Sequence, residues 1–289
     1  MQEVVREFVL EDGIGAQFYR KIYAMCYAMD NGLPFFNRKI KDFFIHEADN
    51  VKTEEDEQRV LDFFNNFLIN PWDRHNFSGD LTVCPRVGEG APDTMGQIMN
   101  TLPQFTKHGP TFNPDNITEN TIVIHIRRGN VVPGNPRWLD ESIYIKILEN
   151  INGTIKQLGL DNPEIVIVTD APDTDKKYKP INKHQDGKWN QDHLVRDENG
   201  YFDTVSLNFD RFRHVLPNII ILNNLNPEDA FLKMLRAKVL VVSPSIFSHA
   251  AALLSKNTVI DVCGRKVRFN GSYGHFDDTG MLFKYDPTY

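Results

Sequence analysis

Hydrophobic residues along the chain alternate between short continuous runs, which predict strands, and helical spacings. Residues 4–10 form the first run and predict a strand. The apolar positions after the next glycine turn recur at the spacing of one helix face: Phe18, Ile22, Met25 and Met29. A second helix is predicted over 54–68, where Thr53 and Asp56 approximate a capping box. The N-terminal part is therefore expected to combine strands and helices.

The C-terminal part repeats strand and helix in close order. The predicted strands are 121–126, 164–169, 219–222, 239–243 and 259–262, and the predicted helices are 140–151, 227–236 and 247–254. Right-handed crossovers between such units build a parallel sheet with helices on both faces. Two polar stretches, 70–114 and 172–203, are expected to be mostly irregular. We predict an α/β fold with an N-terminal α/β part over 1–120 and a C-terminal doubly wound part over 121–289.

Composition narrows the class of protein. The chain has 289 residues, of which 41% are hydrophobic and 25% charged, as is typical of a globular protein. A net charge of −7, without a cluster of Lys and Arg, argues against binding to nucleic acid. Three widely spaced cysteines, Cys26, Cys84 and Cys263, supply neither a disulfide framework nor a four-ligand zinc site.

The sequence predicts no membrane segment and no export signal. No stretch approaches the ~18 uninterrupted apolar residues of a membrane helix. Charged residues interrupt the N-terminus where a signal peptide needs an apolar core. We therefore expect a soluble protein, cytoplasmic or otherwise unexported.

The strand over 121–126 and the residues after it, which read TIVIHIRRGN, carry the clearest chemistry. Because side chains alternate along a strand, His125 and Arg127 share one face and project together at its carboxyl end, where Arg128 follows. Ligands of open α/β sheets bind at this end, and arginine offers phosphate oxygens a forked, permanent charge. The segment predicts a diphosphate site; surface salt bridges and a satisfied strand histidine are the alternative.

Two further segments carry signals for an anion site. Ser245 and Ser248 lie where a strand passes into a small-residue helix, whose first backbone N–H groups favour an anion. An ordinary helix cap is the alternative role of Ser245. Gly13 and Gly15 form a tight turn, but the third glycine of the dinucleotide fingerprint is missing. The two glycines alone indicate only a close approach of the backbone to a neighbour.

Taken in order, these segments resemble the motifs of a known enzyme family. GIGAQFYRKIYAMCYAM, IVIHIRRGN and EDAFLKMLRAKVLVVSPSIFSHAA are similar to motifs of the inverting fucosyltransferases of the α-1,2, α-1,6 and protein-O-fucosyl superfamily. The resemblance is confined to these segments. It implies a GT-B-like fold of two lobes, in which the C-terminal lobe holds a nucleotide sugar and the acceptor enters from the N-terminal lobe.

The resemblance also implies roles for individual residues. The donor-binding residues that it implies are Gly13, Gly15, His125, Arg127, Arg128, Asp229, Ser245, Phe247 and Ser248. Arg127 is expected to hold the β-phosphate with support from Arg128, and Asp229 to read the base. His125 is expected to lie against the nucleoside. Enzymes of this family typically need no metal, because arginines neutralise the leaving diphosphate, so we expect no metal and no cofactor besides the nucleotide-sugar substrate.

Two positions depart from the family pattern. Asn130 stands where the family usually has Asp, and Asn135 where the α-1,6 branch has its catalytic Glu, so the general base must come from elsewhere. Asp73 lies beside Trp72 in the loop NPWDRH, and a carboxylate next to an aromatic ring suits a sugar acceptor. We predict Asp73 as the base and Arg127 as the second catalytic residue. Stabilisation of a local turn is the alternative role of Asp73.

These features predict an inverting, metal-independent glycosyltransferase that moves a sugar from a nucleoside-diphosphate sugar to a glycan hydroxyl. GDP-fucose is the donor that the family implies. A UDP-sugar such as UDP-xylose is the alternative, since no motif separates the two and small anchor-free transferases of this type use varied donors. An inactive glycan-binding protein of the same fold is a third hypothesis, which Asn130 and Asn135 keep open. A nucleotide hydrolase lacks support, because the Gly-Lys-Ser/Thr phosphate loop is missing.

Overall fold

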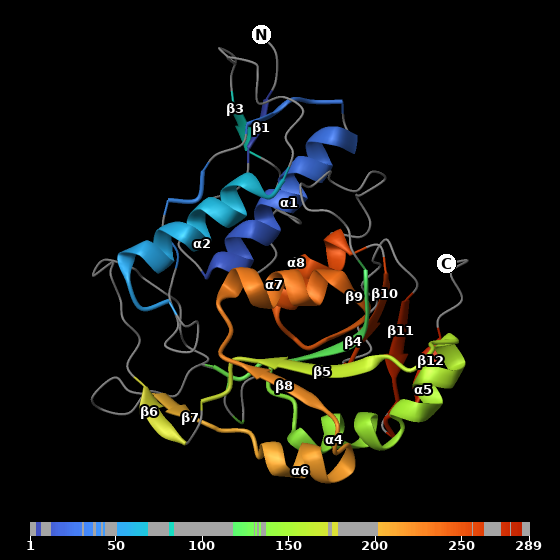
Figure 1. The fold of residues 1–289 in the computed structure, drawn as a ribbon. Coiled ribbons are helices and arrows are strands. Elements are labelled where there is room, and N and C mark those ends of the chain that lie inside the picture. The colour runs from blue at the N-terminus through green and yellow to red at the C-terminus, as the bar shows by residue number, and fades with distance from the viewer. Residues whose placement is uncertain are drawn as a thin grey trace.

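The computed structural model describes residues 4–6, 13–30, 32–36, 39–41, 43, 51–68, 81–83, 118–129, 131, 133, 137–172, 175–178, 202–255, 257–262, 273–277 and 279–284. Helices and sheets alternate in layers within this part of the chain (Figure 1). A large sheet lies between two layers of helices, and a smaller sheet lies beyond the N-terminal helices. The predicted α/β class is confirmed.

The larger sheet has seven strands in the order β12-β11-β10-β9-β4-β5-β8. Their bounds are β4 Glu119–Ile126, β5 Glu164–Thr169, β8 Ile220–Asn223, β9 Ala237–Val242, β10 Thr258–Asp261, β11 Tyr273–Phe276 and β12 Leu282–Lys284. All neighbouring strands are parallel except β11 and β12. The chain runs outward from β4 through β5 to β8 and then returns to β9 on the other side of β4. The predicted doubly wound sheet is thus confirmed, with its switch point between β4 and β9.

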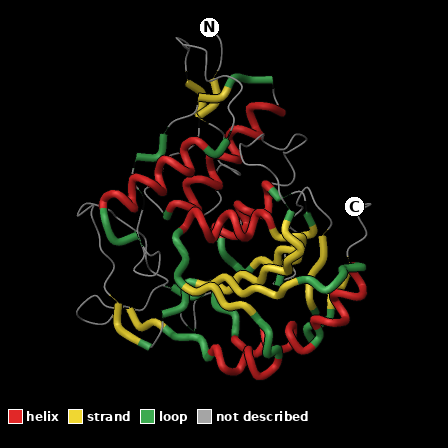
Figure 2. Tube along the Cα trace, in the orientation of Figure 1, coloured by secondary structure: helices red, strands yellow, loops and turns green. Residues whose placement is uncertain are grey.

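Helices cover both faces of this sheet, as the layers in Figure 2 also show. One face carries α4 Glu141–Glu149, α5 Ile151–Leu158 and α6 Phe209–Val215, and the other carries α7 Pro227–Arg236 and α8 Ile246–Leu254. Successive side chains of β4 point alternately to the two helix layers. Ile122, Ile124 and Ile126 belong to the core beneath α4, whereas Val123 belongs to the core beneath α7 and α8. A strand buried on both faces needs such a continuous apolar run.

The N-terminal residues form a second parallel sheet, in the order β2-β1-β3, and two helices. The elements are β1 Val4–Arg6, α1 Ile14–Asp30, β2 Phe35–Phe36, α2 Glu54–Asn66 and β3 Leu81–Val83. The predicted capping box of α2 is present, since the N–H of Asp56 donates to Thr53 Oγ1 and the N–H of Thr53 donates to Asp56 Oδ2, both at 3.1 Å.

Three short strands lie in stretches that the sequence predicted as mostly irregular. β3 belongs to 70–114, and β6 Lys176–Tyr178 pairs antiparallel with β7 Phe202–Thr204 around 172–203. These strands have only three residues each, which is too short for hydrophobic periodicity to reveal.

One aromatic core joins the N-terminal helices to the C-terminal ones. Phe231 of α7 lies at its centre, with the ring centroids of Phe18, Phe64 and Phe67 at 5.5, 5.3 and 5.4 Å in edge-to-face arrangements. Helices from both sides of residue 120 therefore share their packing. The division into two lobes at that residue stays a prediction.

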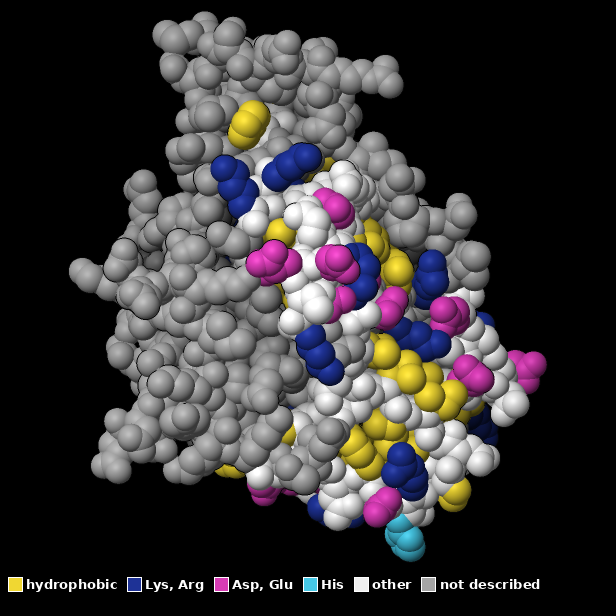
Figure 3. Space-filling model, turned by 60° about the vertical axis from the view of Figure 1, so that its left-hand side comes forward, with side chains coloured by type: hydrophobic (Ala, Val, Ile, Leu, Met, Phe, Trp, Pro, Cys, Tyr) yellow, Lys and Arg dark blue, Asp and Glu magenta, His cyan; other side chains and the backbone are white. Residues whose placement is uncertain are grey.

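The described surface is mixed in character. On the face of the molecule in Figure 3, acidic and basic side chains lie interspersed. None of the helices in the described ranges is both long and apolar enough to cross a membrane. The large apolar side chains that are exposed include Phe283, on the edge strand β12, which is 61% exposed.

We expect Phe231→Ala to lower the free energy of unfolding by about 3–5 kcal/mol, because it leaves a cavity among rings from both halves of the sequence. Phe283→Ala is the matched control and should cost less than roughly 1 kcal/mol, since its side chain is already largely exposed. Urea unfolding measures both. Wild-type stability of the Phe231 variant, or separate transitions for the two halves, would show that the shared core does not hold them together.

Candidate functional site

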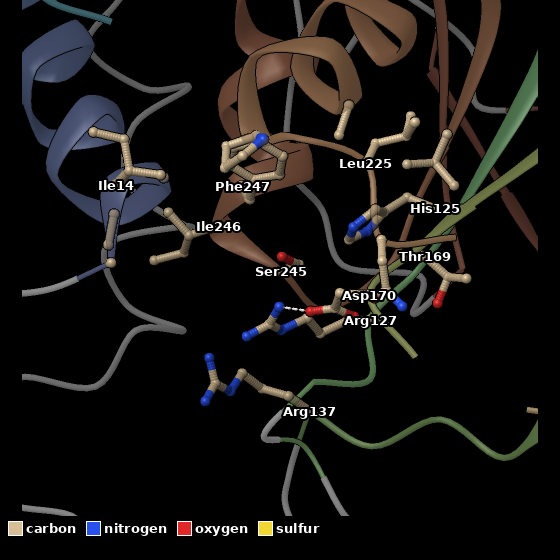
Figure 4. Close-up of a pocket in the computed structure, with 17 residues that line it drawn as sticks. Ile14, His125, Arg127, Arg137, Thr169, Asp170, Leu225, Ser245, Ile246 and Phe247 are labelled. Atoms are coloured by element: carbon tan, nitrogen blue, oxygen red, sulfur yellow. Dashed lines mark ion pairs between the residues drawn. The ribbon is translucent and has the colours of Figure 1, made fainter. Parts of the chain in front are cut away.

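A pocket lies at the carboxyl ends of β4, β5 and β8, beside the switch point of the sheet (Figure 4). Three helices begin at its wall. Residues 13–16 come from the start of α1, Pro227 and Ala230 from α7, and Ile246 and Phe247 from α8. Crevices at this edge are where doubly wound sheets bind their ligands, so the fold itself marks the pocket as a candidate site.

The three helix starts make the pocket favourable for an anion. The first four backbone N–H groups of a helix lack partners within the helix, and the helix dipole places partial positive charge at the same end. At the start of α8, the side chain of the cap residue Ser245 makes no capping hydrogen bond. The Ser245 side chain therefore does not cap the helix, and Ser245 lines the pocket instead. Helix starts of this kind bind phosphate groups.

Gly15 allows two of these helix starts to meet. A Cβ atom at this position would lie 2.7 Å from Phe247 Cδ2 and 2.9 Å from Phe247 Cα. Because the second of these atoms belongs to the backbone, no rotation of a side chain can relieve the contact. The predicted close approach at this glycine is thus an approach of α1 to α8.

An ion pair between Arg127 and Asp170 lies in the pocket (Figure 4). Ile126 at the end of β4 is in register with Thr169 at the end of β5. The residues that follow the two strands therefore meet, and each side chain of the pair is 14% exposed. Such charge-assisted pairing between a guanidinium and a carboxylate also fixes the orientation of the arginine.

Gly129 lets the chain turn closely around Asp170. Its φ is +42°, in the left-handed region that favours glycine, and its N–H donates to the carbonyl oxygen of Asp170 at 3.1 Å. A Cβ atom here would lie 2.6 Å from Asp170 Oδ2 and 3.3 Å from Arg127 Nη1. A side chain at this position would strain the backbone and collide with the ion pair.

A second arginine, Arg137, lines the pocket from the segment between β4 and α4. In Figure 4 the guanidinium groups of Arg127 and Arg137 lie on one side of the pocket, and the side chains of Phe247 and Leu225 lie on the opposite side. A ligand with a phosphate part and a heterocyclic part matches this division, because arginine suits phosphate and apolar walls suit a flat ring.

His125 contributes a neutral ring to the pocket. Its Nδ1 lies 2.7 Å from Ser243 Oγ, in a hydrogen bond whose direction depends on the tautomer. Burial, together with the smaller effect of the positive charge of Arg127, lowers the pKa of His125 from 6.5 to about 3. The ring is therefore uncharged near neutral pH, and it offers a ligand hydrogen bonding and contact rather than charge.

The structure brings together six of the donor-binding residues that the sequence predicted. These pocket-lining residues are Gly13, Gly15, His125, Arg127, Ser245 and Phe247. They come from three segments far apart in the chain. Their roles toward a ligand stay predictions.

Arg128 lies outside this pocket. It is 1% exposed, and its guanidinium carbon lies 4.0 Å from the ring centre of Trp138. Burial lowers the pKa of Arg128, with smaller opposing effects of nearby Tyr144 and Glu141. Successive residues of an extended segment point to opposite faces, so Arg128 turns toward the α4 layer when Arg127 faces the pocket. The predicted support of Arg127 by Arg128 stays a prediction.

Asp229 and Ser248 also lie outside the residues that line the pocket. Asp229 is exposed on α7, where the next residue, Ala230, faces the pocket instead. Ser248 is fully buried, and its hydroxyl donates to the carbonyl oxygen of Ser245 at 3.0 Å. Helical geometry separates the faces of adjacent residues by ~100°, which accounts for the difference between Asp229 and Ala230.

Asp73, Asn130 and Asn135 lie outside the described residues. Within the residues that the structure does describe, no three His, Cys, Asp or Glu side chains gather as a metal ion would require. Because Asp73 is not among the described residues, its role as the general base stays a prediction.

Two charged residues of the pocket lining, Asp170 and Arg137, were not predicted from the sequence. A signal for Asp170 exists, because it directly follows β5, the strand that neighbours β4, and Arg127 directly follows β4. Parallel neighbours end at the same edge, so a charged residue after each strand marks a possible pair. Arg137 lies in a loop and has no comparable signal.

The sequence matches no family model, and no curated protein matches it. Among solved structures, the chain is similar to NodZ α-1,6-fucosyltransferase co-crystallised with GDP, at 11% identity and a TM-score of 0.38, over 100% of this chain and 99% of that one. Fucosyltransferase NodZ from Bradyrhizobium is similar at 10% identity and a TM-score of 0.37, over 99% of this chain and 98% of that one. NodZ soaked with GDP-fucose has the same identity and TM-score, over 99% of both chains. A likeness at this TM-score does not identify an activity, so only the residues of the site can support one.

We expect His125 to make the folded state less stable in acid. Between pH 6.5 and about 3 the unfolded chain takes up a proton at this residue and the folded chain does not. Stability should therefore fall as the pH is lowered through this window, by ~1.4 kcal/mol per pH unit from this group. Urea unfolding at pH 6.5, 5.5 and 4.5 measures the slope.

His125→Asn should flatten that slope while keeping a hydrogen-bonding group near Ser243. His214→Asn, at an exposed position on α6, is the matched control and should leave the slope close to that of the wild type. Equal slopes in the wild type and the His125 variant would contradict a buried neutral imidazole.

Proposed function

We propose that this chain is an inverting glycosyltransferase that moves a sugar from a nucleoside-diphosphate sugar to a hydroxyl group of a glycan. One observation supports this most strongly: three helix starts and two arginines converge on one pocket at the switch point of a doubly wound sheet. The resemblance of the motifs around Gly13, Arg127 and Ser245 to those of inverting fucosyltransferases gives the reaction class.

The two sides of the pocket suit the two ends of a nucleoside diphosphate. Arg127 and Arg137 can hold the phosphates together with the first turn of α8. The neutral ring of His125 and the apolar side chains of Leu225 and Phe247 provide a wall for the nucleoside. Asp229, the base-reading residue that the motif resemblance implies, is exposed on α7 outside the pocket lining.

The proposed reaction is a direct displacement. The acceptor hydroxyl attacks the anomeric carbon of the donor sugar, and the bond between that carbon and the β-phosphate oxygen breaks. The electron pair of this bond goes to the diphosphate, whose growing charge Arg127 and Arg137 stabilise. Because two guanidinium groups offset the charge of the leaving group, we propose that the transfer needs no metal ion.

The proton of the acceptor must go to a carboxylate on the side of the sugar opposite the diphosphate. We assign this role to Asp73, which follows Trp72 in the N-terminal half. The donor sugar stays open between GDP-fucose, which the motif resemblance implies, and a UDP-sugar such as UDP-xylose. An inactive glycan-binding protein is the competing hypothesis, and it predicts no cleavage of any donor.

We expect GDP or UDP to raise the melting temperature, in the presence of EDTA as well as with Mg²⁺. At a ligand concentration 100 times Kd the stabilisation is about 2.7 kcal/mol. Arg127→Gln and Arg137→Gln should each weaken the nucleotide's affinity by roughly 10-fold or more, since each removes a charge-assisted contact to phosphate. Arg213→Gln, exposed on α6, is the matched control and should not change it.

A panel of GDP, UDP, GDP-fucose, UDP-xylose and UDP-glucose in that assay identifies the nucleotide. A folded wild-type protein that responds to none of them has no donor site. A response that EDTA abolishes would instead make the site metal-dependent.

We expect Asp73→Asn to reduce sugar transfer by roughly 100-fold or more while leaving nucleotide affinity unchanged, because a general base acts on the acceptor and not on the donor. Transfer to a glycan mixture and calorimetric titration with the nucleotide measure the two effects. Near-normal transfer by this variant would remove Asp73 from the mechanism.

A further inference from the structure

Asp170 is the carboxylate that contacts the central arginine of the pocket. Both of its oxygen atoms are engaged by the protein, since Oδ2 pairs with the Arg127 guanidinium and Oδ1 accepts a hydrogen bond from the N–H of Arg128 at 2.6 Å. Its own carbonyl oxygen accepts the N–H of Gly129. The segment 127–129 is thus wrapped around this one residue.

This arrangement fixes the guanidinium before a ligand arrives. An arginine side chain has several rotatable bonds, and holding it in one orientation costs conformational entropy. A carboxylate that pairs with the guanidinium removes this cost from the binding and reaction steps.

The same carboxylate also opposes the binding of an anion. Arg127 and Arg137 supply two positive charges to the pocket, and Asp170 offsets one of them at contact distance from Arg127. A negative charge beside a partly buried phosphate site lowers the affinity of that site for a free diphosphate. Asp170 therefore fixes the orientation of Arg127 and at the same time weakens the binding of the diphosphate in the ground state.

We propose that Asp170 is a positioning residue that orients Arg127 toward the leaving diphosphate while limiting how tightly the free diphosphate is held. This inference rests on the proposed function. In the transition state the diphosphate gains charge, so a correctly oriented guanidinium contributes more there than in the complex with the donor. When the reaction is complete, the carboxylate competes for the same guanidinium and favours release of the diphosphate.

The geometry argues against a role of Asp170 as the general base. Its Oδ2 is buried against Arg127 and has no exposure through which it could meet an acceptor hydroxyl. Under the proposed function Arg127 holds the diphosphate, so Asp170, which contacts Arg127, lies on the diphosphate side of the sugar. An inverting displacement requires the base on the opposite side of the sugar.

Asp170→Asn tests the proposal, because it keeps the size of the side chain and an oxygen that can accept the Arg128 N–H. We expect this variant to bind inorganic pyrophosphate and GDP or UDP roughly 3- to 10-fold more tightly, since one negative charge is lost beside the anion. We also expect it to cleave a bound donor at least ~10-fold more slowly in single turnovers, because Arg127 is less well oriented.

Asp175→Asn is the matched control for the loss of one negative charge. Like Asp170, Asp175 comes after β5 in the chain, but it is exposed and lies outside the pocket lining. Its carboxylate accepts hydrogen bonds from the N–H and the hydroxyl of Ser206. It should change neither affinity nor rate. Asp170→Glu restores the charge one methylene further out, and it should bring the affinity back toward the wild-type value without restoring the full rate.

Tighter binding together with slower cleavage supports the positioning role, since damage to the fold would weaken both. An unchanged rate, or weaker binding together with slower cleavage, overturns it.

If the wild type binds pyrophosphate but neither nucleotide, the proposed function fails. In that case tighter pyrophosphate binding by Asp170→Asn still supports the role of Asp170 at an anion site, and weaker binding overturns it. A wild type that binds neither pyrophosphate nor either nucleotide overturns both.

Discussion

The parallel register around β4 is the constraint on which the site depends. Ile126 lies opposite Thr169 on one side of this strand, and Ile124 lies opposite Val241 on the other. The three strands therefore end at one edge, and the residues that follow them are brought together although they lie far apart in the sequence. Arg127 and Asp170 meet for this reason, and Ser245 starts α8 at the same edge. A slip of one residue in β4 would turn Arg127 to the opposite face and remove the ion pair.

The start of α1 reaches this edge because of two separate packing features. The aromatic core around Phe231 fixes α1 and α2 against α7, and Gly15 removes the side chain that would hold α1 away from α8. Neither feature contacts a phosphate. Together they place the first turn of α1 beside that of α8, so that two helix dipoles act on the same pocket. The pocket is thus completed by the N-terminal half, although the charged residues of its described lining come from the C-terminal half.

Much of this arrangement follows from local sequence rules. Five of the seven strands of the doubly wound sheet, the capping box at Thr53 and the common face of His125 and Arg127 were predicted from periodicity and capping patterns, whereas the edge strands β11 and β12 were not. The expected support of Arg127 by Arg128 came from adjacency in a motif, and the two-residue period of the strand places these residues on different faces. Asp229 likewise matched a motif position but is exposed on α7. Arg137 depends on the path of a loop between β4 and α4, which no periodic pattern describes. Side-chain direction within a regular element is therefore predictable, whereas contributions from loops need tertiary structure.

The two adjacent arginines show how burial decides what a charge can do. Arg128 is buried against the ring of Trp138, where cation–π contact partly replaces hydration and the charge serves the packing beneath α4. Arg127 is buried to a lesser degree and faces a carboxylate, so its charge is balanced but can still reach a ligand. His125 adds no charge, because its burial keeps it neutral. Arginine stays protonated at any pH that the protein tolerates, so the charged side chains in the described lining of the pocket near neutral pH are two guanidinium groups and one carboxylate. In a chain with a net charge of −7, a phosphate-binding pocket must arise from such local placement, because the overall charge opposes it.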